Sequence, residues 1–444
     1  MLHSLTLLSL LVHLTSSAAS QTAYGASFSF LRWVSLFALV GFGFASWATT
    51  RRPPIRMEAL NIRVAVYLGL WSLTVVGADY PLFSAYRLAA HAMIVVAGLV
   101  LLPAVLRLKD FRILLPALKI VVGVILLISY FRPAQLTSMD DPNLVRGIMG
   151  DSNALGHTAA IGCLLFLHGF VSQRGTRWGS IQAALAALAA IMLIRSGARS
   201  AVVAFLGGFV PMLIFYRARL SRYFTIAAAA GGVALLALPF LSERISEFLV
   251  KHGSSQVEET DVTISSVGAS RLSLWTREWS DFIERPLLGW GFGLDSQVNM
   301  SNWDGGFSSA GVTKIDPTND TLYTLEEGGV VGFFAYVFMM SLLFKTWIPK
   351  MTRSAFEAEL RRPGYEPVAA IYEAQKAFYC LSILLVVLFE FDNTALAAGN
   401  FFAALLWVSL GLSAGLQARL MYGMRNIMPA ARMPQSPAVA FPAR

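Results

Sequence analysis

Three arginines in this sequence are placed to hold a phosphate or pyrophosphate group. Arg195 and Arg199 flank the small residues 196–198, and Arg271 lies in a later polar segment. A guanidinium group stays charged and can bind two phosphate oxygens at once. Arg199 also opens an apolar run, and the free backbone N–H groups at the start of a helix would attract the same anion. The alternative is that Arg195 and Arg199 extend to lipid headgroups.

A second polar group is suited to proton transfer. Asp316, Thr318 and Asn319 lie close together in the sequence, and Glu327 follows them. A general base must lie within hydrogen-bond distance of the hydroxyl that it activates. Asp316 is the strongest candidate, His252 and Glu327 are weaker ones, and the hydroxyl of Thr318 is a poor base. These residues are equally compatible with a base elsewhere, a reaction without a strong base, or an inactive protein.

Three glycines form a candidate support for these groups. Gly289, Gly291 and Gly293 alternate with larger residues after Pro286. Glycine accepts backbone conformations that other residues avoid, so the alternation favours a turn. We expect this turn to bring Arg271 and residues 316–319 close to Arg199.

Metal and redox chemistry have little support in the sequence. It contains no Asp-x-Asp motif and no Cys and His set with zinc spacing. Cys163 and Cys380 fall within apolar runs, which indicates packing rather than a disulfide. His157 follows Asn153 by one helical turn, so it is either packed beside it or in contact with a substrate. Because arginines can supply the positive charge, we expect a metal-independent mechanism without a cofactor.

The composition is that of a membrane protein. Hydrophobic residues make up 56% of the 444 residues and charged residues 14%, which leaves too few polar residues to cover a soluble globule. A helix needs roughly 20 apolar residues to cross the hydrocarbon core. Such runs predict spans near residues 27–48, 61–79, 87–106, 112–131, 152–172, 180–196, 199–216, 222–241, 328–348, 377–396 and 399–417. The apolar start, Leu5–Leu14, is a further helix, a signal-like segment or a misassigned start.

The predicted fold class is therefore an all-α polytopic membrane protein with about 11–12 transmembrane helices. Lys and Arg cluster in alternate connections, which marks those as cytoplasmic. The cation-poor residues 242–327 should form one long periplasmic loop containing short helices. The expected parts are an N-terminal transmembrane bundle at 1–241, this loop, C-terminal transmembrane helices at 328–427 and a disordered cytoplasmic tail at 428–444. The net charge of +9 reflects topology rather than nucleic-acid binding.

One amphipathic helix is expected inside the long loop. Apolar residues recur there at three-to-four spacing between Arg271 and Ile283: Leu272, Trp275, Trp279 and Phe282. Ser270 would be the N-cap, and Pro286 follows a natural stop. Two indoles on one face suit a helix in the membrane interface. Packing against the transmembrane bundle is the alternative, and the two are compatible.

Four short motifs occur in order along the chain. They are Asp151–Gly156 (DSNALG, with Asn153), Ser196–Ala201 (SGARSA), Arg271 and Trp275 with Pro286–Gly293 (PLLGWGFG), and Thr318-Asn319, Leu322 and Glu327–Gly332 (EGGVVG). In this order, and with this topology, they resemble the motifs of the superfamily of O-antigen ligases and of O-antigen and exopolysaccharide polymerases. One departure stands out, because Thr318 occupies the position of the family's histidine.

The resemblance implies an inverting glycosyltransferase in the bacterial inner membrane, with its active site facing the periplasm. A glycan would pass from an undecaprenyl-pyrophosphate-linked oligosaccharide donor to a hydroxyl of a glycan acceptor beside the lipid bilayer. Cations placed on the leaving pyrophosphate would lower the barrier. Carried over by motif, these cations are Arg199, Arg271 and Arg195, the catalytic group is Asp316, Thr318 and Asn319, and the supporting residues are Asn153, Gly289, Gly291, Gly293 and Glu327.

The acceptor is less well defined than the donor. The patterns around Asn153 and residues 289–293 favour a polymerase of exopolysaccharide or O-antigen repeats, with a ligase to lipid A core as the alternative. A chain-length regulator or an export protein is a candidate partner. The rival from another class is a flippase or exporter of the same lipid-linked sugar, for which Lys119 is an ionisable group in a span. Carriers usually bind their substrates near the bilayer midplane, whereas the charged motifs here cluster on one face.

Overall fold

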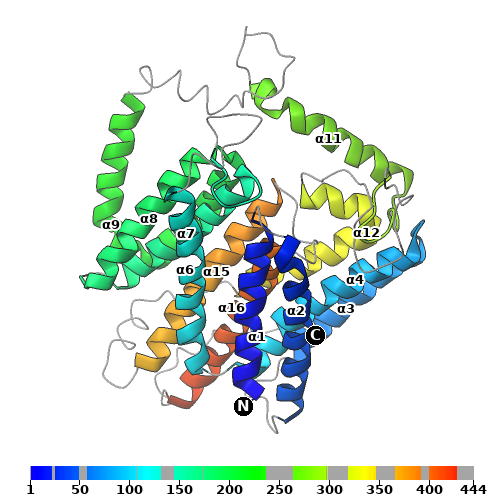
Figure 1. Ribbon diagram of the computed structural model, residues 1–444, viewed down its shortest axis with the longest axis horizontal. Coiled ribbons are helices and arrows are strands. Elements are labelled where there is room, and N and C mark those ends of the chain that lie inside the picture. The colour runs from blue at the N-terminus through cyan, green and yellow to red at the C-terminus, as the bar shows by residue number, and fades with distance from the viewer. Residues whose placement is uncertain are drawn as a thin grey trace, which may run out of the picture.

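The computed structural model of the protein describes residues 2–22, 26–49, 58–106, 108–131, 145–173, 175–236, 264–296, 298, 319–346, 366–391 and 400–427. Within these ranges every named element is a helix (Figure 1). Ten of the helices in the described ranges are long and apolar enough to cross a membrane. The predicted all-α polytopic class is therefore confirmed.

The helices follow one another with short connections in most of the chain. In order they are α1 (Leu2–Ser20), α2 (Ala26–Thr49), α3 (Glu58–Val76), α4 (Pro81–Val96), the π-helical turn η1 (Ala97–Leu101), α5 (Leu102–Val105), α6 (Leu108–Phe131), α7 (Ser152–Ser172), α8 (Arg177–Arg195), α9 (Arg199–Leu236), α11 (Ile264–Glu284), α12 (Asp320–Met340), α13 (Leu342–Thr346), α15 (Glu366–Phe389) and α16 (Phe401–Ile427). The apolar start of the chain is thus helical, and α1 packs along α2.

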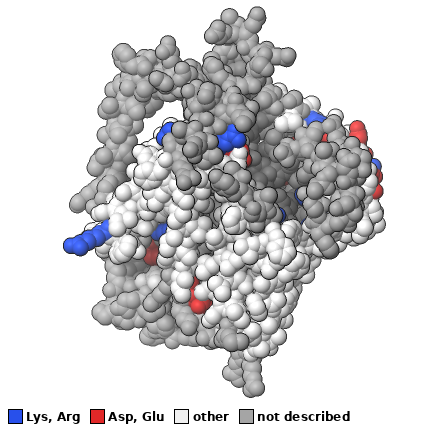
Figure 2. All heavy atoms as spheres, in the orientation of Figure 1, with Lys and Arg blue, Asp and Glu red and all other residues white. Residues whose placement is uncertain are grey.

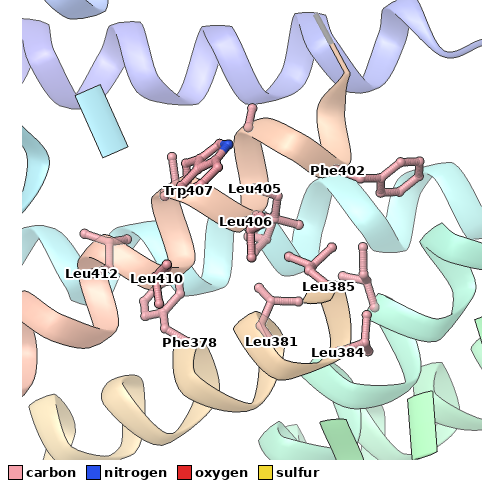
Figure 3. Close-up of a cluster of buried hydrophobic side chains, with 14 of the residues drawn as sticks. Phe378, Leu381, Leu384, Leu385, Phe402, Leu405, Leu406, Trp407, Leu410 and Leu412 are labelled. Atoms are coloured by element: carbon pink, nitrogen blue, oxygen red, sulfur yellow. The ribbon is translucent and has the colours of Figure 1, made fainter. Parts of the chain in front are cut away.

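Two neighbouring helices, α15 and α16, form the centre of the bundle (Figure 1). Figure 3 shows side chains of this pair, which include Phe378 and Leu381 of α15 and Leu406 of α16, while Trp407 of α16 points away from α15. These side chains are almost completely buried. The turn η1 crosses α16 so closely that a Cβ on Gly411 would lie 2.0 Å from the carbonyl oxygen of Gly98. Small residues allow such close backbone contact between membrane helices.

The described surface agrees with a location in lipid. Figure 2 shows that most of the described atoms on this face belong to uncharged residues, with Lys, Arg, Asp and Glu in a few separate places. Large apolar side chains are exposed on the outer faces of several spans, such as Phe37 on α2, Ile120 on α6 and Phe334 on α12. In water such faces would be costly, whereas hydrocarbon accepts them.

The expected loop after the span at 199–216 is absent. Residues Arg217–Arg222 are helical and lie inside α9, so hydropathy wrongly predicted a connection there. These residues read RARLSR and include neither glycine nor proline. Each of them tolerates a helical backbone, and nothing in the local sequence ends the helix. The cluster of cations therefore marks a polar stretch of α9 rather than a turn.

Three helix starts also differ from the expected ones. α12 begins at Asp320, before residue 328 where hydropathy predicted a span, and α15 begins at Glu366 rather than 377. The early turns of α15 contain Glu373 and Lys376, yet Lys376 is buried with its ammonium 4.0 Å from the centroid of the Tyr372 ring. α11 begins at Ile264, so Ser270 lies within the helix and is not its N-cap.

Candidate active site

The turn between α8 and α9 is the first of two places where the predicted motifs meet. Its backbone is tight, because Gly197 has a positive φ of 65° and its N–H donates to the carbonyl of Ile194 at 3.1 Å. The hydroxyl of Ser196 donates to the carbonyl of Leu193 at 2.7 Å and accepts from the N–H of Ala198 at 3.3 Å. The SGARSA motif is therefore a self-capped turn that joins two spans.

The DSNALG motif packs directly against this turn. Asp151 is the N-cap of α7, and its side chain accepts from the N–H of Ala154 at 2.8 Å. A Cβ on Gly156 would lie 2.3 Å from the Cβ of Ala198, so only glycine permits this separation between α7 and the turn. His157 is buried, with its Nε2 3.4 Å from the hydroxyl of Ser200. Residues far apart in the sequence thus form one unit.

The arginines of this unit lie at its accessible edge. Arg195 is the last residue of α8 and its side chain is exposed, whereas Arg199 is the first residue of α9 and is half-buried. The carbonyl of Arg195 accepts from the N–H of Val145 at 3.1 Å, which ties the turn to the segment before α7. Asn153 lies half-buried in the first turn of α7. Two cations and a helix N-terminus therefore occur together at this end of the bundle.

The second meeting point joins the PLLGWGFG loop to α12. The helical hydrogen bonding of α12 breaks at Gly329, whose φ of 57° and ψ of −155° are not helical. The loop supplies the missing partners on both sides of the break. Trp290 and Gly291 donate to the carbonyls of Glu326 and Glu327 at 3.0 and 2.8 Å.

On the far side of the break, the direction of donation reverses. The N–H of Val330 donates to the carbonyl of Pro286 at 2.8 Å, and that of Val331 donates to the carbonyl of Leu287 at 3.3 Å. Buried backbone groups need such partners, above all where water is scarce. The EGGVVG and PLLGWGFG motifs are therefore the two halves of one backbone junction, which we call the loop–α12 junction.

Glycine is required on both sides of the loop–α12 junction. Gly289 has a positive φ of 64°, and a Cβ there would lie 2.5 Å from the carbonyl oxygen of Glu326. A Cβ on Gly329 would lie 2.5 Å from the carbonyl oxygen of Leu287. Side chains are excluded at both positions by backbone conformation and by space. Their spacing in the sequence reflects a backbone-to-backbone contact rather than flexibility.

The rest of the loop is fixed against α3 and α4. Phe292 is buried with its ring centroid 4.9 Å from that of Trp71, and Gly293 leaves room for Arg87. Arg285, just before the loop, forms an ion pair with Asp79 at 2.9 Å. Its guanidinium also lies 3.9 Å from the centroid of the Trp290 ring. The contacts of the glycine turn are therefore with α12, α3 and α4.

The loop–α12 junction buries carboxylates that sequence reasoning largely missed. Glu327 was expected as a supporting residue, and it is fully buried in the turn before the break. Asp320 and Glu326 of α12 are equally buried. Asp281 of α11 and Asp295, which follows the glycine loop, are buried as well. The available signal was the adjacent acidic pair Glu326 and Glu327, directly before the span predicted at 328–348. Among the described residues no set of three or more side chains has metal-ligand geometry.

Asn319 links the junction to the centre of the bundle. Its side-chain oxygen caps α12 by accepting from the N–H of Leu322 at 2.9 Å, and its Nδ2 donates to the carbonyl of Glu390 at 2.7 Å. Thr321 donates to the carboxylate of Glu390 at 2.8 Å. Glu390 follows α15, on which α9 also packs. The helix α15 is therefore the described connection between the two motif units.

Several predicted residues lie outside what the structure describes. Asp316, Thr318 and His252 are not among the described residues, and only the backbone of Arg271 is described, within α11. Their roles stay predictions. The expected approach of residues 316–319 to the α8–α9 turn likewise stays a prediction, although Asn319 at the start of α12 is placed.

The α8–α9 turn and the loop–α12 junction both fall within a match to a known family. Residues 184–337 match the family described as O-antigen ligase. The chain carries an O-antigen ligase family domain. The match begins within α8, includes the α8–α9 turn and α11, and ends within α12. It confirms the resemblance expected from the motifs and supports enzymatic glycosyl transfer of the O-antigen ligase and polymerase type. A search of curated proteins found no match.

Proposed function

We propose that this protein transfers a glycan from undecaprenyl pyrophosphate to a hydroxyl of an acceptor sugar at the periplasmic face of the inner membrane. The observation that carries the proposal is the α8–α9 turn, where two arginines and the start of α9 converge at one end of the bundle. The O-antigen ligase family match across this turn supports it. An anionic leaving group at a membrane surface fits such a site.

In the proposed reaction the acceptor oxygen attacks C1 of the donor sugar while the bond from C1 to the pyrophosphate oxygen breaks. The negative charge that grows on the pyrophosphate is stabilised by Arg199, Arg195 and Arg271. The acceptor's proton passes to a base, for which we propose Asp316. Direct displacement inverts the configuration at C1. Because the cations come from the protein, turnover should persist in excess chelator.

We propose a polymerase of exopolysaccharide or O-antigen repeats in preference to a ligase, on the sequence patterns around Asn153 and residues 289–293. Both reactions share the donor and differ in the acceptor. In a polymerase the acceptor is a second lipid-linked repeat, so products form a ladder of lengths. In a ligase the acceptor is lipid A core, and one transfer ends the reaction.

Transport of the same lipid-linked sugar is the alternative from another class. The break in α12 favours it, because discontinuous helices often line substrate sites in carriers. However, the break is filled by the backbone of residues 286–291, and Lys119 in α6 donates to the side chain of Gln182 at 3.1 Å. These groups are therefore engaged with protein partners, which favours the transferase.

The test is reconstitution of the purified protein in vesicles with lipid-linked repeat units. A ladder of lipid-linked products supports the polymerase, a single product on added lipid A core supports the ligase, and movement of substrate between leaflets without a new bond overturns both. Arg271→Ala and Asp316→Asn should each slow transfer, whereas Thr318→His should raise the rate if a base is limiting. Full activity of both Arg271→Ala and Asp316→Asn would remove these two residues from the mechanism.

A further inference from the structure

Helix α11 has its polarity reversed for a helix that faces water. Glu278 and Asp281 lie buried on the side toward α12, whereas Leu272, Trp279 and Ile283 are 61%, 49% and 59% exposed. The exposed residues recur at the spacing of one helix face. A water-facing helix would place the carboxylates outside and the apolar side chains inside. The exposed apolar side of α11, which we call its outer face, therefore needs an apolar partner.

Asp281, on the buried side, has several partners within the protein. The carboxylate of Asp281 accepts from the hydroxyl of Ser296 at 2.7 Å and lies 3.8 Å from the guanidinium of Arg277. Its backbone carbonyl accepts from the indole N–H of Trp290 at 3.1 Å. These contacts fix the rotation of α11 about its own axis. They hold the outer face away from the protein.

The hydroxyl on the outer face already has a hydrogen-bond partner within the helix. Among its described side chains, the polar Thr276 donates its hydroxyl to the carbonyl of Leu272 within the same helix at 2.7 Å. Such back-bonding satisfies the hydroxyl without solvent. Ser280 and Glu284, which are also exposed, lie about 100° further round the helix and border the outer face on its polar side.

The outer face continues into the lipid-facing surface of a span. Leu287 is 71% exposed directly after α11, and its carbonyl accepts from the N–H of Val331 in α12. Val330 and Phe334 are exposed on α12, which is long and apolar enough to cross the membrane. Exposed apolar side chains thus occur on α11, at Leu287 and on the transmembrane helix α12, which is hydrogen-bonded to Leu287.

We infer that the outer face of α11 lies in the interface of the bilayer and binds lipid rather than a protein. Figure 1 shows α11 beside α12 at a wide angle to α1 and α2, near the end of the bundle where α1 ends. Tryptophan is enriched at membrane interfaces, where its ring is apolar and its N–H can reach water. Trp279 occupies that position on the outer face. The protein would therefore hold a helix at the membrane surface by its own apolar side chains.

The test measures membrane depth and needs no transfer activity. Both native cysteines, Cys163 and Cys380, are buried, and alanine replaces them in the starting protein. Leu272→Cys and Ile283→Cys then place a nitroxide label on the outer face, and Ser280→Cys and Glu284→Cys are the matched controls. In phospholipid nanodiscs, spin relaxation is measured with oxygen, which concentrates in lipid, and with a water-soluble nickel chelate.

Labels at Leu272 and Ile283 should be relaxed more by oxygen than by the nickel chelate, and the ratio should reverse at Ser280 and Glu284. Equal nickel access at all four positions would show a water-exposed face and overturn the proposal. Protection of the outer face from both reagents would mean that a protein covers it, which also overturns it. Oxygen access that appears only after a polyprenyl pyrophosphate is added would assign the face to that lipid's tail instead.

Discussion

The α8–α9 turn and the loop–α12 junction both depend on glycine, but they leave their polar groups in different places. At the turn, Gly156 brings α7 against residues 196–201 while Arg195 stays exposed. At the junction, Gly289 and Gly329 bring two backbones together, and the neighbouring carboxylates are buried. The motifs of the family domain therefore have two roles. The α8–α9 turn presents cations, and the loop–α12 junction fixes the break in α12. If the division holds, a side chain added at the junction should cost more stability than one added at the turn.

The largest effect is expected at the break itself. Gly329→Ala combines a glycine-only conformation with a contact of 2.4 Å to the carbonyl carbon of Leu287, and it should destabilise the fold by about 4 kcal/mol. Gly69→Ala is the control, because nothing lies within 4 Å of a Cβ there, and it should be neutral or stabilising by up to about 1 kcal/mol. Thermal unfolding in detergent measures both. Equal melting of the two variants would mean that the loop does not occupy the break.

A smaller loss is expected at the turn. Gly156 has no backbone strain, so Gly156→Ala costs only the displacement of Ala198 and Ser196, about 2.5 kcal/mol. Because the displaced residues carry the arginine turn, transfer should slow even below the melting temperature. Gly41→Ala, in open space on α2, is the control. A variant of Gly156 with parental stability would show that the two motifs are not in contact.

The cap of α12 should contribute less. Asn319→Ala removes both the acceptor for Leu322 and the donor to Glu390, and we expect a loss of about 1.5 kcal/mol. Asn319→Ser keeps a cap but cannot reach Glu390, so its loss should be about 0.5 kcal/mol. Unfolding curves of the two variants measure the difference. Identical curves would mean that the cap contributes nothing, and parental stability of Asn319→Ser would remove the link to α15.

The ion pair at the rim of the junction should matter least. Arg285 and Asp79 have side chains that are 33% and 47% exposed, so solvent screens them and their coupling should be about 0.5 kcal/mol. A double-mutant cycle with Arg285→Gln and Asp79→Asn measures it, and the coupling should fall in high salt. A coupling of several times this size would mean that the pair, rather than the backbone bonds, holds the loop.

Much of the fold could be predicted from hydropathy, because each span must be apolar along its length. The spans predicted near 152–172, 180–196 and 199–216 agree with the start of α7 and with the short turn between α8 and α9. The break at Gly329 could not be predicted, since its backbone partners come from residues 286–291, more than thirty positions away in the sequence. The continuity of α9 was missed because hydropathy responds to Arg217 and Arg222, while a helix responds to backbone propensity.

The site was predictable only in part, because some of its residues are brought together only by the tertiary structure. The arginines of the α8–α9 turn stand out because cations are few in the connections predicted to face the periplasm. The buried carboxylates Asp320 and Glu326 stand in a segment that hydropathy assigned to the loop, so their burial was not evident. Their environment is created by α3, α11 and the loop, which only the tertiary structure brings together.

The most direct test of the division is the transfer rate of Arg199→Ala beside that of Arg177→Ala in the same vesicles. Arg177 is exposed at the opposite end of α8. Arg199→Ala should melt like the parent and transfer at least about 100-fold more slowly, because one charge partner of the leaving group is lost. Arg177→Ala should keep the parental rate. Full transfer by folded Arg199→Ala would contradict the account, because the turn would then present its cations to something other than the leaving pyrophosphate.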